Sequence, residues 1–447
     1  MTNGRPFRLV LRFSAPLAMG SLLQQCYSLT DAAIVGNVAG VDALAAIGAT
    51  SWVVWLLLAI CRDSSTAFCI LASVRVGAGK LEGFKRVEFN AALAALALAL
   101  AVTVPAAIYI DPVLSMISIP ENIYADARTY LMFYILSMPL LLVYNMASAM
   151  LAAAGNSRIP LYAMVASALT NIALDFLFII GLKWGVFGAA LATLLSAGTA
   201  ASIALFGMRG KEPYRTRKEH RRLDLKILGA AVKLWLPLFF SSALIAAGGM
   251  FVQKSMNLLG SDFVAGRSAG NKIFNLLEAI IMALQTGVSI FAGQNLGANK
   301  IGRIRGGVRE ITFVSILVTT AMTGLVWLFG DEVIALFLSK SDPAAYAEAF
   351  QTGTRMIRVL ASGMFLMTPM YFYRAIIQVL GYANIPIAVG AAQLVARVLA
   401  VIYLPRYLGE YTYYLIDVFA WAVSLPIVYI AYRLKIRRIE RTYVAVR

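Results

Sequence analysis

Two polar residues stand four positions apart in a segment that is otherwise apolar. They are Asn171 and Asp175, in the stretch 160–181. On a helix, residues four apart lie on one face. An acid in the middle of a membrane-spanning helix costs roughly 2.5–3.5 kcal/mol or more, and it usually faces a protein interior or a wet cavity. The pair therefore predicts proton or cation binding inside a bundle of helices.

Composition indicates what kind of bundle this is. Of the 447 residues, 60% are hydrophobic and 14% are charged, whereas soluble domains average about 25% charged residues. Long apolar runs recur along the chain, and the run 91–110 has no charge over twenty positions. About twenty helical residues cross a hydrocarbon core. We therefore expect an all-α polytopic membrane protein.

The apolar runs predict twelve transmembrane helices. Their expected limits are 14–36, 45–72, 88–110, 129–153, 160–181, 186–208, 231–256, 268–292, 308–330, 356–380, 386–405 and 412–432. The net charge is +17, but the basic residues gather in alternate short loops, which favours a positive-inside membrane topology over nucleic-acid binding. We expect a location in the cell inner (plasma) membrane, with both termini cytoplasmic.

The second half of the sequence repeats the first. Gly77-Ala78 with Lys80 is matched by Gly297-Ala298 with Lys300 at an offset of 220, and Gly155 with Pro160 is matched by Gly381 with Pro386 at an offset of 226. Six spans repeated in one orientation predict two parallel bundles related by an axis along the membrane normal. The expected domains are an N-terminal bundle (1–208), a basic cytoplasmic linker (209–227), a C-terminal bundle (228–432) and a basic cytoplasmic tail (433–447).

Several kinds of catalytic chemistry find no support in the sequence. It contains no phosphate-binding loop, no nucleophile elbow and no cysteine or histidine metal spacing. The three cysteines, Cys26, Cys61 and Cys69, fall in apolar runs and are expected to be buried. The single histidine, His220, lies in the basic linker. We expect no enzyme activity, no metal and no cofactor, and a role in ion-driven transport.

Three stretches resemble the multidrug and toxic compound extrusion (MATE) family. They are Gln24–Gly36 with Asp42–Gly48, Gly155–Ser196 and Gln294–Ala298. The resemblance implies a V-shaped pair of six-helix bundles that export organic, often cationic compounds by alternating access. A proton gradient, or a sodium gradient, would drive the export. It also implies small-molecule substrates, contact with membrane lipids, no nucleic acid and a monomer.

In the proton-coupled, DinF-like branch of that family, an acid in the first span joins an Asn-x-x-x-Asp pair in the fifth. Asp31, Asn171 and Asp175 match these positions, and Thr193 matches a further polar position in the sixth span. Ser148, or Asn145, would add a polar group from the fourth span. An alternative is that these residues are structural and never change their protonation.

Other residues are candidates for a substrate cavity or for ion pairs. The aromatic, thioether and charged side chains that could line a cavity are Tyr27, Tyr144, Met146, Glu278, Tyr371 and Arg374. Glu278 is the acid that we consider within the C-terminal spans. Arg62, Asp63 and Lys254 are unexpected charges within spans, and an ion pair between Asp63 and Lys254 is one hypothesis. Arg62 and Asp63 are adjacent, so a helix is not expected to make them face each other.

Two other functions remain open from the sequence. A flippase of lipid-linked oligosaccharides or peptidoglycan precursors would need a basic cavity, for which Arg62, Arg374 and Arg397 are candidates. A membrane receptor or assembly factor could also use a transporter scaffold without transporting anything.

Overall fold

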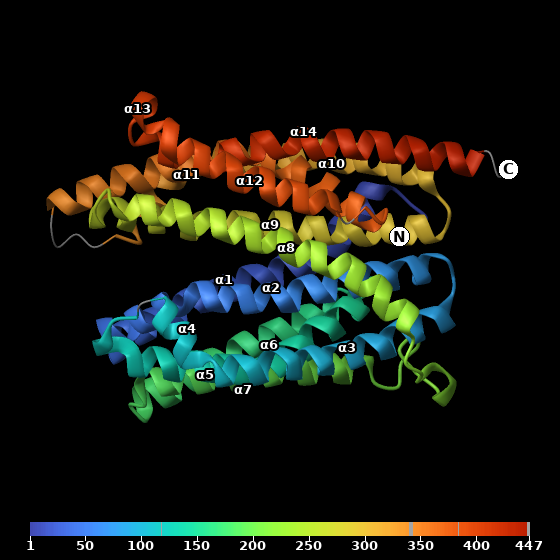
Figure 1. Cartoon of the computed structure of the whole chain (residues 1–447), viewed down its shortest axis with the longest axis horizontal. Helices are drawn as coiled ribbons and strands as arrows, with labels where there is room; N and C mark the ends of the chain where they lie inside the picture. Colours follow the sequence, from blue (N-terminus) through green and yellow to red (C-terminus); the bar gives the residue numbers. More distant parts are fainter. Residues whose placement is uncertain (118, 339–342, 383, 445–447) are drawn as a thin grey trace. The chain divides into compact units, whose positions relative to one another are not determined.

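The computed structural model describes residues 1–117, 119–338, 343–382 and 384–444. Within these residues the chain contains helices and no strand, and twelve of the helices are long (Figure 1). The long helices are α1 (Pro6–Ile34), α2 (Val41–Gly77), α3 (Leu81–Ile108), α5 (Glu121–Ala153), α6 (Arg158–Asp175), α7 (Gly185–Met208), α8 (Leu225–Asn257), α9 (Ser261–Gly297), α10 (Ile301–Ala335), α11 (Pro343–Val379), α12 (Asn384–Tyr403) and α14 (Tyr411–Val444).

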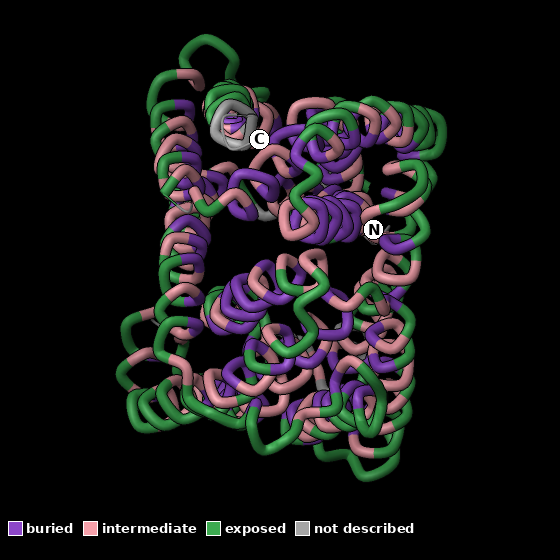
Figure 2. The backbone as a smooth tube through the Cα atoms, turned by 90° about the vertical axis from the view of Figure 1, so that its right-hand side faces the viewer, coloured by how far each residue is buried: buried purple, intermediate pink, exposed green. Residues whose placement is uncertain are grey.

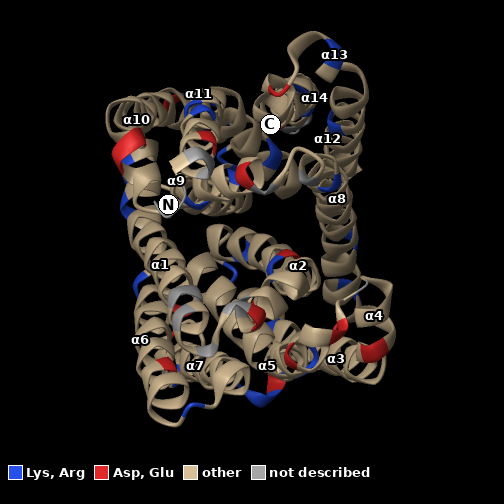
Figure 3. Cartoon of the chain, turned by 90° about the vertical axis from the view of Figure 1, so that its left-hand side faces the viewer, with Lys and Arg blue, Asp and Glu red and all other residues tan. Residues whose placement is uncertain are grey.

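Each predicted span coincides with one of these helices. Ten of them are long and apolar enough to cross a membrane, and α1 and α11 are the two that are not among the ten. Most of the ribbon carries neither a basic nor an acidic residue (Figure 3). The prediction of an all-α polytopic membrane protein is confirmed. The last three residues of the predicted tail, 445–447, lie outside the described residues.

The sequence pattern did not predict several short elements. Two of them are π-helical turns, η1 (Val35–Ala39) after α1 and η2 (Phe176–Gly181) after α6. The others are α4 (Ile110–Met116), α13 (Pro405–Leu408) and the 3-10 turn η3 (Lys218–His220). They are too short to produce a hydrophobic period, which is why the apolar runs gave no sign of them.

The chain divides into two compact units, each with six long helices. The N-unit comprises Phe13–Trp235, and the C-unit comprises Met1–Arg12 together with Leu236–Arg447. The basic linker 209–227 therefore belongs to the N-unit. The buried residues of each unit lie mainly where its own helices face one another (Figure 2).

The first residues of the chain, which belong to the C-unit, pack against the turn between α9 and α10. Lys300 Nζ donates hydrogen bonds to Thr2 O and to Asn3 Oδ1, each at 3.0 Å. Arg303 donates to Gly4 O, and Asn295 Nδ2 donates to Met1 O at 3.3 Å. The turn between α9 and α10 is therefore covered by the start of the chain.

Glycines bring α9 and α11 into backbone contact inside the C-unit. Gly266 and Gly270 are four apart on α9, and both face Gly353 on α11. A Cβ atom built on Gly266 would lie 2.2 Å from Ala349 O, and one built on Gly353 would lie 3.0 Å from Gly266 O. Small residues at this spacing allow membrane helices to pack closely where lipid supplies no hydrophobic drive.

We expect Gly266→Ala to destabilise the C-unit, because the methyl group would push α9 away from α11. Overpacking of this kind costs about 1–3 kcal/mol. Thermal unfolding in detergent would measure it. Gly302→Ala is the control, since Gly302 on α10 has no atom within 4 Å of an added Cβ. Equal melting temperatures for the two variants would contradict the prediction.

Candidate functional site

The predicted acids lie on two helices of the N-unit. Asp31 is in the last turn of α1 and is partly buried, and Asp175 is the last residue of α6 and is fully buried. Asn171 is 1% exposed and lies one turn before Asp175. Gly20 lets α1 approach α6, because a Cβ atom there would lie 2.9 Å from Met164 Sδ. The structure therefore brings together the three residues that the sequence singled out.

A π-helical turn follows each acid. η1 begins four residues after Asp31, and η2 begins directly after Asp175. The two turns contact each other. Ile34, Val35 and Ile179 join Ala43, Val186 and Ala189 in one apolar cluster beside them. Such turns often occur at functional sites, where they shift the helical register. Here they place an apolar layer next to the acids, which keeps the carboxyl groups in a medium of low dielectric constant.

Four buried oxygens of this site have no hydrogen-bond donor among the described residues. The carboxyl groups of Asp31 and Asp175 are close enough to interact electrostatically with each other. Within the part of the chain that the structure describes, Asp31 Oδ1, Asn171 Oδ1 and both Asp175 oxygens are buried and unpartnered. Two unit charges 4 Å apart repel by about 4 kcal/mol at an effective dielectric constant of about 20. A single proton or cation between the two groups would remove that repulsion.

Tyrosine side chains surround the acid pair. Tyr27, predicted as a cavity residue, is in electrostatic range of both acids. Tyr130 on α5 is also in range of both acids, and its ring centroid lies 6.4 Å from that of Tyr134. Sequence reasoning missed Tyr130. The signal was present in the four-residue spacing of these two tyrosines, which places two phenol groups on one face of a span.

Thr193 and Ser148 each interact within their own helix. Thr193 Oγ1 donates to Ala189 O of its own helix at 3.0 Å, and Ser148 interacts with Tyr144 one turn earlier on α5. Across the described residues, neither hydroxyl is hydrogen-bonded to Asp31 or Asp175. Asn145 Nδ2 donates to Leu141 O, within its own helix. Met146 is buried in the N-unit, as are Cys61 and Cys69. Cys26 on α1 is exposed, so the expected burial of the cysteines is wrong for this residue. The assignment of Thr193 and Ser148 to the coupling site stays a prediction.

The expectation that Arg62 and Asp63 cannot face each other is wrong. Arg62 Nε donates to Asp63 Oδ1 at 3.2 Å, and the guanidinium carbon lies 5.5 Å from the centroid of the Trp55 ring. The arginine side chain is long enough to fold back along the helix, which the rule for helix neighbours does not take into account. Lys254 is exposed on α8 in the C-unit. Its proposed pairing with Asp63 stays a prediction.

The C-unit has a polar network of its own. Tyr371 donates to Glu278 Oε1 at 2.8 Å, and Arg374 Nη2 donates to Ser241 at 3.2 Å. Arg397 on α12 is 8% exposed and bonds Asp417 Oδ1 through Nε and Nη2. Sequence reasoning overlooked Asp417, although an acid within the span 412–432 was visible. The structure therefore brings together Glu278 and Tyr371, as two of the predicted cavity residues.

The repeat relates Arg397 to the acid site. At the offset of 226, α6 begins at Arg158 where α12 begins at Asn384, and Asn171 corresponds to Arg397. Both are buried. Where the N-unit has an amide beside unpartnered acids, the C-unit has a guanidinium that is already paired with an acid. The two sites therefore differ in their need for an added positive charge.

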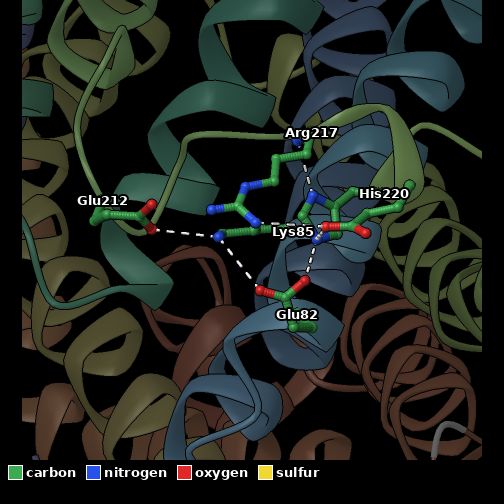
Figure 4. Close-up of polar contacts among 6 residues, drawn as sticks. Glu82, Lys85, Glu212, Arg217 and His220 are labelled. Atoms are coloured by element: carbon green, nitrogen blue, oxygen red, sulfur yellow. Dashed lines mark hydrogen bonds and ion pairs between the residues drawn. The ribbon is translucent and has the colours of Figure 1, made fainter.

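One group of residues on the surface of the N-unit has the donor set of a metal site. The possible ligand atoms of Glu82, Glu219 and His220 lie within 4.8 Å of one another. Figure 4 shows that these atoms already have partners: His220 Nε2 bonds Glu82, and His220 Nδ1 accepts the N–H of Arg217. Lys85 Nζ lies 3.4 Å from both Glu82 and Glu212. The positive charge of Lys85 disfavours a metal ion here, and both nitrogens of the His220 imidazole already have partners. These contacts instead hold the linker against α3.

The linker is held further by buried aromatic packing. The ring centroids of Tyr214 and Phe84 are 6.0 Å apart. Burial, helped by the nearby Glu88 carboxyl, raises the pKa of Tyr214 to about 12. The phenol is therefore neutral at any physiological pH, so the linker stays docked without depending on its ionisation.

We expect Asp175→Asn to stabilise the protein at pH 8. The amide would remove the like charge and would give Asp31 a donor, for a gain of about 1–2 kcal/mol. Thermal unfolding in detergent would show a higher melting temperature than the wild type. Asp126→Asn, which neutralises an exposed acid of α5, should leave the melting temperature unchanged. A lower melting temperature for Asp175→Asn would show that the carboxylate already has a stabilising partner.

Known proteins share this sequence pattern and fold. The sequence profile of the MatE family matches residues 16–177 and 237–403. The probable multidrug resistance protein YpnP of Bacillus subtilis is 28% identical over 353 residues, which cover 78% of each chain. The probable multidrug resistance protein YoeA of the same organism is 26% identical over 344 residues, covering 75% of this chain and 74% of YoeA.

A solved structure gives the same result for the fold. An outward-facing multidrug resistance MATE family transporter of the MOP superfamily superposes with a TM-score of 0.90, at 20% identity, over 98% of this chain and 97% of that chain. The profile match extends over both repeats and over most of the chain. The resemblance seen in the sequence is confirmed, and this chain belongs to the MatE family of membrane transporters.

Proposed function

We propose that this protein is a secondary active exporter that releases organic, cationic drug-like compounds in exchange for protons. The observation that carries the proposal is the group of unpartnered acceptor oxygens from Asp31, Asn171 and Asp175. A proton or an organic cation would each relieve the repulsion between the carboxyl groups. Occupancy by one therefore opposes occupancy by the other, and such competition is what an antiporter requires. The names of the multidrug resistance relatives support this proposal.

The acids would act as one coupled site. Because they interact strongly, they would gain and lose protons as a pair. Tyr27 and Tyr130 would orient the proton through their phenol groups, and Asn171 would supply a further acceptor. Sodium is the alternative coupling ion, since carboxylate and amide oxygens also suit a hard cation. We propose that the protein acts as a monomer in the plasma membrane with both termini cytoplasmic, without enzyme activity and without a bound cofactor.

Contacts of the arginines favour export over the flippase alternative. A flippase of lipid-linked precursors would need cations that are available to a pyrophosphate group. Arg62 is hydrogen-bonded to Asp63, and Arg397 is bonded to Asp417. Arg374 donates to Ser241. At the site of Asp31, Asn171 and Asp175, the buried atoms that lack a partner are acceptor oxygens, which attract positive charge.

We expect Asp31→Asn and Asp175→Asn to reduce proton-driven efflux to background, because an amide cannot take up or release the coupling proton. The measurement is efflux of a fluorescent organic cation from proteoliposomes under an imposed pH gradient. In the wild type, this efflux should be abolished by a protonophore and should be insensitive to a sodium gradient.

Asp126→Asn is the matched control for the loss of one carboxylate, and it should transport at the wild-type rate. Wild-type efflux in Asp175→Asn would refute the coupling role of the pair. Efflux that depends on a sodium gradient and is insensitive to the protonophore would show that sodium, and not the proton, is the coupling ion. A wild-type protein without any flux, of cations or of lipid-linked sugars, would favour the receptor or assembly-factor alternative.

A further inference from the structure

A cavity of about 250 Å³ lies at one end of the N-unit. It is formed where α2 ends at Gly77, where α3 begins at Leu81 and where α8 begins at Leu225. All three helices have apolar segments long enough to cross a membrane. Their ends therefore meet at a boundary between hydrocarbon and water, and the cavity opens at that boundary.

Three cationic side chains line this cavity. They are Arg75, Arg86 and Lys226, and all three are exposed. Over the described ranges, no hydrogen bond or ion pair engages any of their charged groups. A second cavity shares Gly83 and Arg86 with the first and adds Lys80. With Asp224 as the acid in the lining of the first cavity, three cations face one carboxylate there, and the region carries a net positive charge.

Both acids close to these cations are already engaged. Asp224 Oδ1 caps α8 by accepting the N–H groups of Lys226 and Ile227, at 2.9 and 3.2 Å. Glu82 is bonded to His220 and lies 3.4 Å from Lys85. Asp224 keeps its negative charge while it caps α8, so it offsets one of the three cations, and the cavity retains a net positive charge.

Apolar side chains make up the other part of the lining. Leu71, Val87, Ile227 and Ala230 contribute to the same cavity. Leu81, Leu223 and Leu225 nearby are between 45% and 73% exposed. The site thus combines cations with an apolar wall, at the depth where the phosphate of a lipid gives way to its acyl chains.

The walls of the cavity are fixed by the protein itself. Asn90 is fully buried on α3 and holds the end of the linker, because its Nδ2 donates to Arg222 O and its Oδ1 accepts the N–H of Asp224. Gly83 leaves room for the Arg75 side chain, since a Cβ atom there would lie 3.1 Å from Arg75 Cδ. The three helix ends are therefore held together before any ligand arrives.

The repeat shows what fills the equivalent place in the C-unit. At the offset of 220, Arg75, Lys80 and Gly83 correspond to Asn295, Lys300 and Arg303. Those three residues donate hydrogen bonds to the backbone carbonyls of residues 1–4. By the same offset residues 1–4 correspond to 221–224, which reach the cavity but are held by Asn90 and not by Arg75 or Lys80 in the described residues. The charged groups of Arg75 and Lys80 can therefore take acceptor oxygens from another molecule.

We infer that this cavity binds an anionic phospholipid. Its phosphate would contact Arg75, Arg86 and Lys226, and the glycerol and the start of one acyl chain would lie along Leu71, Val87 and Ile227. The shared chemistry is that of a phosphate diester, and the apolar wall favours a lipid over a soluble phosphate. Each basic residue near a membrane surface adds about 1 kcal/mol to the binding of anionic lipid.

Native mass spectrometry of the detergent-purified full chain would test this inference. The probes are phosphatidylglycerol, phosphatidylcholine and inorganic phosphate. We expect phosphatidylglycerol to bind more tightly than phosphatidylcholine, and Arg86→Gln/Lys226→Gln to weaken its binding roughly 10- to 30-fold. The control Arg158→Gln/Arg221→Gln removes the same charge from exposed residues outside the cavity and should leave the affinity nearly unchanged.

A second variant tests the cavity without altering its charge. Ala230→Phe should obstruct the apolar wall and should weaken phosphatidylglycerol binding while all three cations remain. Equal binding of the two lipids would overturn the inference, as would equal losses in the two double variants. Inorganic phosphate that displaces the lipid at equal concentration would assign the site to a soluble phosphate instead. Melting temperatures of all variants would be measured alongside, and Ala230→Phe decides the outcome if the double variant does not fold.

Discussion

Buried acceptor oxygens without a donor are the constraint on which the N-unit depends. Such groups are costly in an apolar bundle, because they lose their hydration and gain no hydrogen bond. The surrounding structure maintains them nonetheless. Gly20 brings α1 against α6, and the two π-helical turns place an apolar cluster beside the acids. The proposed uptake of a proton or cation would lower this cost, which is the physical basis for assigning the coupling role to these residues.

The two units differ in residue type and in charge at the same position of the repeat. The N-unit has Asn171 there, next to acids that lack a donor, and the C-unit has Arg397, which is bonded to Asp417. Arginine stays protonated at all relevant pH values. The carboxylate of Asp417 in the C-unit therefore always has a positively charged partner. In the N-unit the acceptor oxygens of Asp31, Asn171 and Asp175 have no such partner among the described residues. A repeated fold thus carries different charge balances at equivalent positions of its two halves.

How much could be predicted from the sequence differs between features. The spans followed from apolar runs, and the Asn171–Asp175 pair followed from its spacing, because both depend on local order in the chain. The π-helical turns could not be predicted in this way, because they depend on contacts between helices. The spacing of Tyr130 and Tyr134 indicated a shared helix face, but the nearness of Tyr130 to the acids again depends on contacts between helices. The Arg62–Asp63 contact was predicted wrongly, since a rule about Cβ directions does not describe a long, flexible side chain. Asp417 was visible in the sequence and was overlooked.

The docking of the first residues on the turn between α9 and α10 has a consequence for the order of synthesis. Residues 1–4 contact Asn295, Lys300 and Arg303, which are translated about 300 positions later, or on the order of 15–60 s at roughly 5–20 residues per second. During that interval the leading segment has no native partner. The C-unit is thus completed by residues that are synthesised long before the rest of it. Residues 1–4 must stay accessible until the second half of the chain has been inserted.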